Sequence, residues 1–527
     1  MNRCIPFLAA LMLLAQSVHA DTVRTQSGLV EGISLASGVR AWLGVPFAAP
    51  PVRALRWKPP AAAAPWSGVF HADRRAPMCL QALRTRTMNH YFGNEATSED
   101  CLYLNIWAPA SARKVPVIVW IYGGGFNVGS ASMANYSGEG LARDGVVRVN
   151  LAYRLGALGF LAHPDLSRES GQGASGNYGV MDLIAGLQWV QRNVAAFGGD
   201  PDNVTIAGQS AGSMAVALLQ TSPQARGLFH RAVGMSGSPF SEPLNAVSLA
   251  QGEAEGLALQ MALGGRSIED LRDMSGDRIL GVQVARSPIV IDGHYVIGAR
   301  EAFAKGLQSD VPVMLGFTRD ESFRSLGPVT NVNDLEAAVR RTFPATADQI
   351  LAAYPARDDV SAVRAAVDIG RDSSLGLQMS GWAQAQAQFG KAPIYAYFFT
   401  RRHPYASGIT FIDHDPATVG AYHSAEIPYF LRTRESLNLF RQTRIWEPAD
   451  VALERDMSAL LLSFARHGKP VSARVPQWPV FDTKQARVVS LGAEIRVTDW
   501  PNYQSLHLLA APVAAPNQPV PGARPRD

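Results

Sequence analysis

The chain has 527 residues, of which 47% are hydrophobic and 17% charged, as expected for a globular protein with a large buried core. Its 48 basic and 44 acidic side chains leave a formal charge of +4 without any long Lys/Arg run. The composition excludes a disordered or fibrous protein, and the small net charge argues against a nucleic-acid partner.

The first twenty residues have the pattern of a secretory signal peptide. Arg3 supplies the positive charge, residues 5–15 form an apolar run, and Val18-His19-Ala20 forms a small-residue cleavage site. The apolar run is shorter than the roughly 20 residues that a membrane-spanning helix requires. The sequence therefore predicts a signal peptide at 1–20, a secreted or periplasmic protein, and no integral membrane segment after cleavage.

Two cysteines remain after this cleavage, Cys79 and Cys101. In an oxidising compartment they can pair, and closing the loop between them would stabilise the fold by roughly 3 kcal/mol on the chain-entropy model. Two cysteines without an accompanying histidine cluster do not indicate a zinc site. We expect a disulfide bond, and neither a metal nor an organic cofactor.

Strand-like and helix-like patterns alternate along the rest of the chain. Turn-punctuated alternation at 23–30 and 39–47 predicts antiparallel strands, and later continuous apolar runs predict strands that are covered on both faces. These later strands are expected at 117–122, 145–153, 204–207, 232–235, 311–315 and 394–398, with helices at 181–193 and 450–467. The alternation favours an α/β fold with a large, mostly parallel central sheet and helices on both faces.

No linker-like stretch divides the middle of the chain, so we expect a single domain at 21–508. Residues 509–527 are rich in alanine and proline and lack an apolar period. This composition predicts a flexible tail.

One β-branched run, Val204–Ala207, ends in Gly208-Gln209-Ser210-Ala211-Gly212, after which the pattern becomes helical. A serine on such a sharp strand-to-helix turn has a strained backbone, so glycines two residues to either side must make room. The turn also faces the N-terminus of the following helix, where free N–H groups favour developing negative charge. This pattern predicts that Ser210 is a nucleophile, which needs a base and an orienting acid.

Further motifs accompany this turn, and they are Ser98–Trp107, Gly123–Phe126, Tyr153–Gly156, Gly176–Gly179 and Phe197–Pro201. Together they resemble the type-B carboxylesterases, the cholinesterase-like branch of the α/β-hydrolases, from about residue 30 to residue 489. The resemblance implies an α/β-hydrolase fold and hydrolysis of a small-molecule carboxylic ester through a Ser-His-Glu triad.

The resemblance also implies the other two members of the triad. Residues 316–321 match the family's Gly-x-x-x-Asp-Glu pattern, which makes Glu321 the acid. Its neighbour Asp320 stays an alternative, although alternate residues at the end of a strand point in different directions. Residues 420–427 match the stretch that carries the family's histidine, which makes His423 the base, with His414 as a remote alternative.

By the same resemblance, the backbone N–H groups of Gly124, Gly125 and Ala211 form the oxyanion hole. A phosphate-binding loop is the rival interpretation of residues 123–125, but no Gly-Lys-Ser/Thr follows. Other matched residues imply internal ion pairs (Arg56 with Glu99, and Arg154 with Asp182), a supporting role in the catalytic network (Ser236) and scaffold roles (Asn177 and Tyr178).

The chain departs from the family pattern at several positions. Gln209 stands where most relatives have glutamate before the nucleophile, which keeps the hydrogen-bonding shape but removes a negative charge. The cholinesterases stack a quaternary ammonium on a tryptophan in the first disulfide loop, whereas this loop has no tryptophan and Tyr91 is its nearest aromatic substitute. Both departures favour neutral or acidic acyl/aryl esters over choline esters. Ser424 stands where many relatives have glycine, without a functional reason in the sequence.

Two other functions are compatible with this sequence. The family includes members that kept the fold and lost the serine, so a non-catalytic binding or adhesion protein is one alternative. Amidase or peptidase activity of the same triad is the other. The sequence does not predict an oligomeric state.

Overall fold

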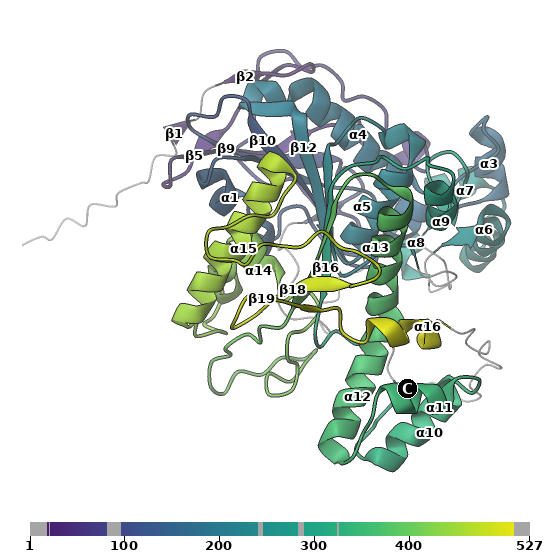
Figure 1. The fold of residues 1–527 in the computed structure, drawn as a ribbon. Coiled ribbons are helices and arrows are strands. Elements are labelled where there is room, and N and C mark those ends of the chain that lie inside the picture. Colours follow the sequence, from purple (N-terminus) through teal and green to yellow (C-terminus); the bar gives the residue numbers. More distant parts are fainter. Residues whose placement is uncertain are drawn as a thin grey trace, which may run out of the picture.

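A twelve-stranded sheet runs through the centre of the computed structural model, which describes residues 18–19, 22–81, 96–240, 246–282, 289–323 and 326–510 (Figure 1). In spatial order the strands are β1 (Val18–His19), β4 (Ile33–Ser34), β5 (Val39–Pro46), β9 (Tyr103–Pro109), β11 (Val147–Leu151), β10 (Val115–Ile121), β12 (Gly199–Gln209), β13 (Arg231–Met235), β16 (Val313–Thr318), β17 (Ile394–Phe399), β18 (Arg487–Leu491) and β19 (Arg496–Asp499).

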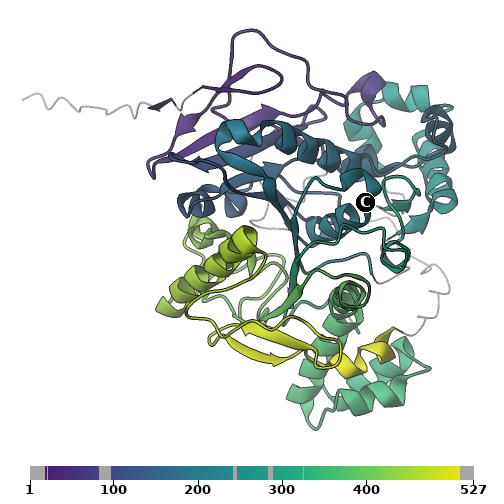
Figure 2. The same cartoon turned by 45° about the horizontal axis from the view of Figure 1, so that its top comes forward.

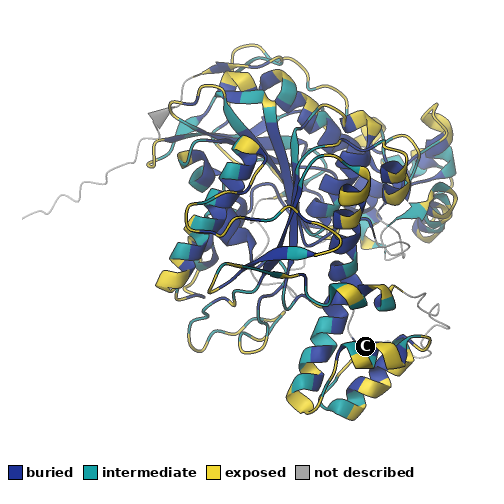
Figure 3. Cartoon of the chain, viewed as in Figure 1, coloured by how far each residue is buried: buried dark blue, intermediate teal, exposed yellow. Residues whose placement is uncertain are grey.

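From β11 to β18 every neighbouring pair of strands is parallel, while the pairs outside this range are antiparallel. The large sheet predicted from the sequence is therefore confirmed as a mixed sheet, and the continuous apolar runs form its parallel centre. Every residue of β11, β16 and β17 is buried, as expected for strands covered on both faces, and Figure 3 shows this buried centre.

Helices cover both faces of the sheet, as the two views in Figures 1 and 2 show. On one face lie α1 (Glu139–Arg143), α14 (Ile427–Leu431) and α15 (Pro448–His467), and on the other lie α4 (Tyr178–Asn193), α5 (Ala211–Thr221) and α13 (Leu377–Phe389). The helices predicted at 181–193 and 450–467 are α4 and α15.

A smaller helical group lies below the sheet in the view of Figure 1 and has its own apolar core. It consists of α10 (Val332–Thr342), α11 (Ala347–Ala353), α12 (Asp359–Arg371) and α16 (Leu506–Leu509). Leu509, which we assigned to the tail, is buried in this core at the end of α16. The rest of the predicted tail, from 511 onward, lies outside the described residues.

The remaining elements are short strands and helices at the periphery. They are the strands β2 (Val23–Arg24), β3 (Leu29–Glu31), β6 (Val69–His71), β7 (Met78–Cys79), β8 (Thr97–Ser98), β14 (Val247–Ser248) and β15 (Val290–Ile291), and the helices α2 (Gly156–Phe160), α3 (Pro164–Glu169), α6 (Leu249–Leu263), α7 (Ile268–Asp273), α8 (Gly276–Gly281) and α9 (Ala299–Ala304).

The predicted signal peptide lies outside the described residues except for Val18 and His19, which form β1 and pair with Ile33 and Ser34 at the edge of the sheet. Among the helices that the structure describes, none combines the length and the apolar composition needed to cross a membrane.

The disulfide between Cys79 and Cys101 is present, and both cysteines are buried. This confirms the pairing expected from the sequence. Tyr91, within the loop that the bond closes, lies outside the described residues.

Both internal ion pairs implied by the resemblance are present. Arg56 Nη2 lies 2.6 Å from Glu99 Oε1, and Arg154 Nη2 lies 2.7 Å from Asp182 Oδ1. Asp182 also accepts hydrogen bonds from the Nε and backbone N–H of Arg154, and its side chain is completely buried. These bonds hold the chain after β11 against α4.

Replacing Asp182 by alanine is expected to lower the free energy of unfolding by about 3–5 kcal/mol, because the buried guanidinium of Arg154 loses its counter-charge. Urea unfolding followed by fluorescence measures this loss. The solvent-accessible pair of Arg266 and Asp270 supplies the control, since Asp270→Ala is expected to cost much less stability than Asp182→Ala. Equal losses in the two variants would contradict the prediction.

Candidate active site

Ser210 lies on the sharp turn between β12 and α5, with φ 58° and ψ −127°. Positive φ is strained for a residue with a Cβ and costs about 1–3 kcal/mol, a strain typical of functional sites. Ser210 is half-buried at the N-cap of α5, yet its side chain makes no capping hydrogen bond. The hydroxyl of Ser210 therefore does not cap the helix.

The two glycines of the motif are sterically required. A Cβ at Gly208 would lie 2.3 Å from the carbonyl oxygen of Gly212, and a Cβ at Gly212 would lie 2.1 Å from that of Ile121. The turn therefore forces close contact between β12, α5 and the end of β10. This is the crowding that the Gly-x-Ser-x-Gly pattern predicts.

Glu321 lies three residues after β16 and is 2% exposed. Its Oε1 accepts hydrogen bonds from the backbone N–H of Thr318, at 2.7 Å, and from the hydroxyl of Ser236, at 2.9 Å. Its Oε2 lies 2.6 Å from Nδ1 of His423. The carboxylate is thus held from one side and directed at the imidazole on the other, and Ser236 has the supporting contact expected of it.

His423 lies in the segment between β17 and α14. The backbone N–H of Ala421 donates to Asp320 Oδ2 at 2.6 Å, and the backbone N–H of Asp320 donates to the carbonyl of Ala421. These bonds anchor the segment beside Glu321. Ser424, directly after the histidine, has φ 77°, in the region that glycine adopts without strain.

The two alternatives to this acid and base have other partners. Asp320 is bound by Arg319 and Arg364, and despite its burial the hydrogen bonds from Arg319, Ala421 and Arg364 lower its pKa. His414 interacts with Asp413 and with the hydroxyl of Tyr405. The contact with Glu321 belongs to His423.

Gln209 provides the second contact of the imidazole. Its side-chain Nε2 lies 3.0 Å from Nε2 of His423, on the opposite side of the ring from Glu321. Gln209, Ser236, Glu321 and His423 therefore meet at the carboxyl ends of β12, β13 and β16, although more than 200 residues separate the first and the last. Ser210 follows Gln209 directly in the chain.

The backbone N–H groups of Gly124, Gly125 and Ala211 donate no hydrogen bond to any residue that the structure describes. Gly125 is exposed and has φ 62°, and Ala211 is the first residue of α5, where helical N–H groups have no intrahelical acceptor. All three groups are available to an oxyanion, which is the role the resemblance implies.

Glu426 is a member of this region to which the sequence assigned no role, although it follows His423 by only three residues. It is fully buried at the N-cap of α14. Burial, and next the negative charge of Glu321, raise the pKa of Glu426 well above its ordinary range. Of the two neighbouring carboxyls, Glu426 is the one whose environment favours the protonated form.

The pKa of Glu426 is higher in the folded state than in the unfolded state, where it is about 4.5. The free energy of unfolding therefore falls as the pH rises from about 4.5 to the folded-state pKa, because ionising the buried carboxyl destabilises the fold. Glu426→Gln is neutral at every pH, so it should become more stable relative to the native chain, by up to about 1.4 kcal/mol per pH unit. Urea unfolding at intervals from pH 4 to pH 8 measures this difference. The exposed variant Glu435→Gln is the control, and a difference that does not grow with pH would contradict the prediction.

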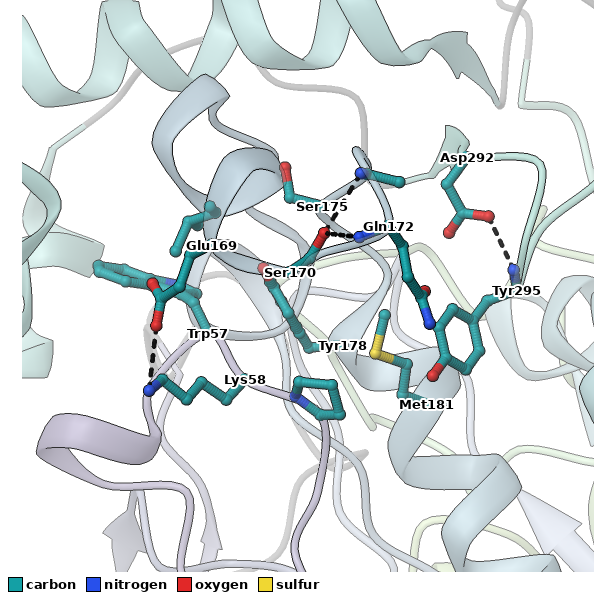
Figure 4. A pocket seen from close by; sticks show the side chains of 13 residues that line it. Trp57, Lys58, Glu169, Ser170, Gln172, Ser175, Tyr178, Met181, Asp292 and Tyr295 are labelled. Carbon is teal, nitrogen blue, oxygen red and sulfur yellow. Dashed lines mark hydrogen bonds and ion pairs between the residues drawn. The ribbon is translucent and has the colours of Figure 1, made fainter.

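A separate hollow of about 200 Å³ opens beside α3 and the start of α4, away from these residues (Figure 4). Lys58 and Glu169 form an ion pair on its rim. Asp292 also lines it, but its oxygens accept from Asn177 and from backbone N–H groups of its own turn, consistent with a scaffold role for Asn177. Within the described ranges, no three His, Cys, Asp or Glu side chains form a group that could hold a metal.

Comparison with known proteins agrees with this architecture. A family model described as "Carboxylesterase family" matches residues 19–508. The chain is 38% identical to the fumonisin B1 esterase of Sphingopyxis macrogoltabida, covering 92% of this chain and 89% of the relative. It is 30% identical to the para-nitrobenzyl esterase of Bacillus subtilis (strain 168), covering 91% of this chain and 96% of the relative.

A solved structure of a PNB esterase superimposes with a TM-score of 0.77 at 28% identity, covering 93% of this chain and 99% of the other. The predicted α/β-hydrolase fold is thereby confirmed. The relatives are named as esterases, and the chain matches them over nearly their whole length. The chain is a member of the carboxylesterase family and an ester hydrolase.

Proposed function

We propose that the chain hydrolyses carboxylic esters through a triad of Ser210, His423 and Glu321 and a covalent acyl-enzyme. The observation that carries this proposal is the 2.6 Å contact between Glu321 Oε2 and His423 Nδ1, beside the strained Ser210 turn. A buried carboxylate on Nδ1 holds the imidazole in the tautomer whose Nε2 can accept a proton.

In the first half of the reaction, Ser210 Oγ attacks the ester carbonyl and its proton passes to Nε2 of His423. Glu321 stabilises the imidazolium that forms. The N–H groups of Gly124, Gly125 and Ala211 bind the oxyanion of the tetrahedral intermediate. His423 then gives its proton to the departing alcohol, and water, activated by the same imidazole, releases the acid from Ser210.

Neutral or acidic acyl/aryl esters are the proposed substrates. Gln209 contributes no negative charge beside the nucleophile, and residues 79–101 contain no tryptophan for a quaternary ammonium to stack on. The name of the relative from Sphingopyxis, fumonisin B1 esterase, supports ester hydrolysis as the reaction.

Export through the predicted signal peptide is part of the proposal, with a single catalytic domain at 21–508. The disulfide between Cys79 and Cys101 supports an oxidising compartment, because such bonds are rare in the reducing cytosol. The periplasm and the extracellular space both satisfy this condition.

A fluorophosphonate probe tests the nucleophile directly, since it reacts with an activated serine. The native chain should be labelled and the Ser210→Ala variant should not. A folded native chain that stays unlabelled would refute the proposal and favour the alternative of a non-catalytic binding protein. Paired ester and amide substrates with the same acyl group distinguish an esterase from an amidase.

Substrate charge is tested with matched pairs of esters. The kcat/KM value of butyrylcholine is compared with that of its uncharged isostere 3,3-dimethylbutyl butyrate, and the value of p-nitrophenyl butyrate with that of p-nitrophenyl hemisuccinate, which carries a free carboxylate. We expect the uncharged and anionic esters to be the better substrates. A clear preference for the choline ester would overturn the substrate assignment and leave the triad untouched.

A further inference from the structure

Gln209 occupies the position from which it can control the proposed base. It is the residue before Ser210, it is 3% exposed, and its amide nitrogen lies 3.0 Å from Nε2 of His423. Nε2 is also the atom that must take the proton of Ser210. The amide and the serine therefore serve the same nitrogen.

The chemistry of the network determines which atom of the amide faces the ring. A carboxylate only accepts hydrogen bonds, so Glu321 requires a proton on Nδ1 of His423. Nε2 of the neutral ring then carries the lone pair, and only the NH2 group of Gln209 can donate to it. The amide oxygen faces Gly123, since a Cβ added to this glycine would lie 3.2 Å from it.

This hydrogen bond favours the neutral ring over the charged one. In the imidazolium both nitrogens are donors, so Nε2–H would meet the N–H groups of the amide instead of an acceptor. A hydrogen bond made only to the neutral form stabilises that form. A carboxylate at position 209 would act in the opposite direction, because it accepts from Nε2–H and attracts the positive charge.

The other groups around the imidazole do not substitute for this effect. Glu321, from the loop after β16, contacts Nδ1, and the ring of Phe323 meets the imidazole edge-on at 4.5 Å between centroids. Glu426 and Tyr397 are both buried, and burial raises the pKa of each well above its ordinary range, which favours their protonated forms. Asp320 is directed at Arg319 and Arg364.

We propose that Gln209 is a positioning residue that holds Nε2 of His423 unprotonated beside Ser210 and thereby keeps the esterase active at acidic pH. This inference rests on the proposed triad. It assigns to the amide a role that a glutamate at this position could not perform. The amide must release Nε2 when Ser210 transfers its proton.

The test is the pH dependence of kcat/KM on uncharged p-nitrophenyl butyrate from pH 4 to pH 9. In Gln209→Glu the acid limb should move to higher pH by about 1–3 units, the usual effect of an opposite charge at this range. Gln209→Met removes the donor without adding charge, so its acid limb should lie between those of the native chain and Gln209→Glu. Gln172→Glu adds the same charge on an exposed loop and should leave the profile unchanged.

Fluorophosphonate labelling at pH 8 accompanies each profile and shows whether the nucleophile and the fold are intact. Labelled variants whose acid limbs coincide with that of the native chain would overturn the role of Gln209 and leave the triad standing. Absence of labelling in the native chain would overturn the triad itself. If Gln209→Glu fails to fold, the shift of Gln209→Met against the native chain decides the question alone.

Discussion

Replacing Ser210 by alanine is expected to lower kcat on p-nitrophenyl butyrate by roughly six orders of magnitude, by analogy with other serine triads. The alanine leaves no atom to form the acyl-enzyme, so only substrate binding and the oxyanion donors continue to act. Because Ser210 is strained in the native turn and makes no capping bond, the loss of its hydroxyl should cost little stability.

Initial rates under saturating ester measure this loss, with unfolding of the same preparation as the check on folding. Ser213→Ala is a matched control, since Ser213 lies one turn further along α5 and bonds the carbonyl of Gly237. It should cost about 1 kcal/mol of stability and leave kcat within tenfold. Near-native turnover in Ser210→Ala would refute the assignment of the nucleophile.

Replacing Glu321 by glutamine is expected to lower kcat by about four orders of magnitude, as loss of the triad acid's charge does elsewhere. The amide can donate to Nδ1, which would place the ring proton on Nε2 and remove the acceptor that Ser210 requires. It would also leave the imidazolium without its counter-charge. The pre-steady-state burst of p-nitrophenol should disappear together with the steady-state rate.

Glu426→Gln is the control for Glu321→Gln, because both carboxyls are buried and adjacent while only Glu321 contacts His423. Burial raises the pKa of Glu426 well above its ordinary range, so its amide isostere should keep kcat within tenfold. Equal losses in the two variants would mean that the charge of Glu321 has no special role.

The sequence by itself was sufficient for features that depend on neighbouring residues. Continuous apolar runs predicted β10, β11, β16 and β17, and the glycines around Ser210 predicted the strained turn after β12. Both signals are local. A continuous apolar run indicates a strand covered on both faces, and a turn follows from the steric freedom of its own residues. The acid and the base, by contrast, were located through resemblance to a family, since no local pattern distinguishes them.

Only the tertiary structure decided which side chains share the site. Asp320 and Glu321 are adjacent in sequence, yet the first turns to Arg364 and the second to His423, 102 residues away. The raised pKa of Glu426 and the contact of Gln209 with Nε2 of His423 are likewise invisible in the sequence. Hydrogen bonding and desolvation act over a few ångströms in space, so the protonation of each group depends on neighbours that the fold brings together from distant parts of the chain.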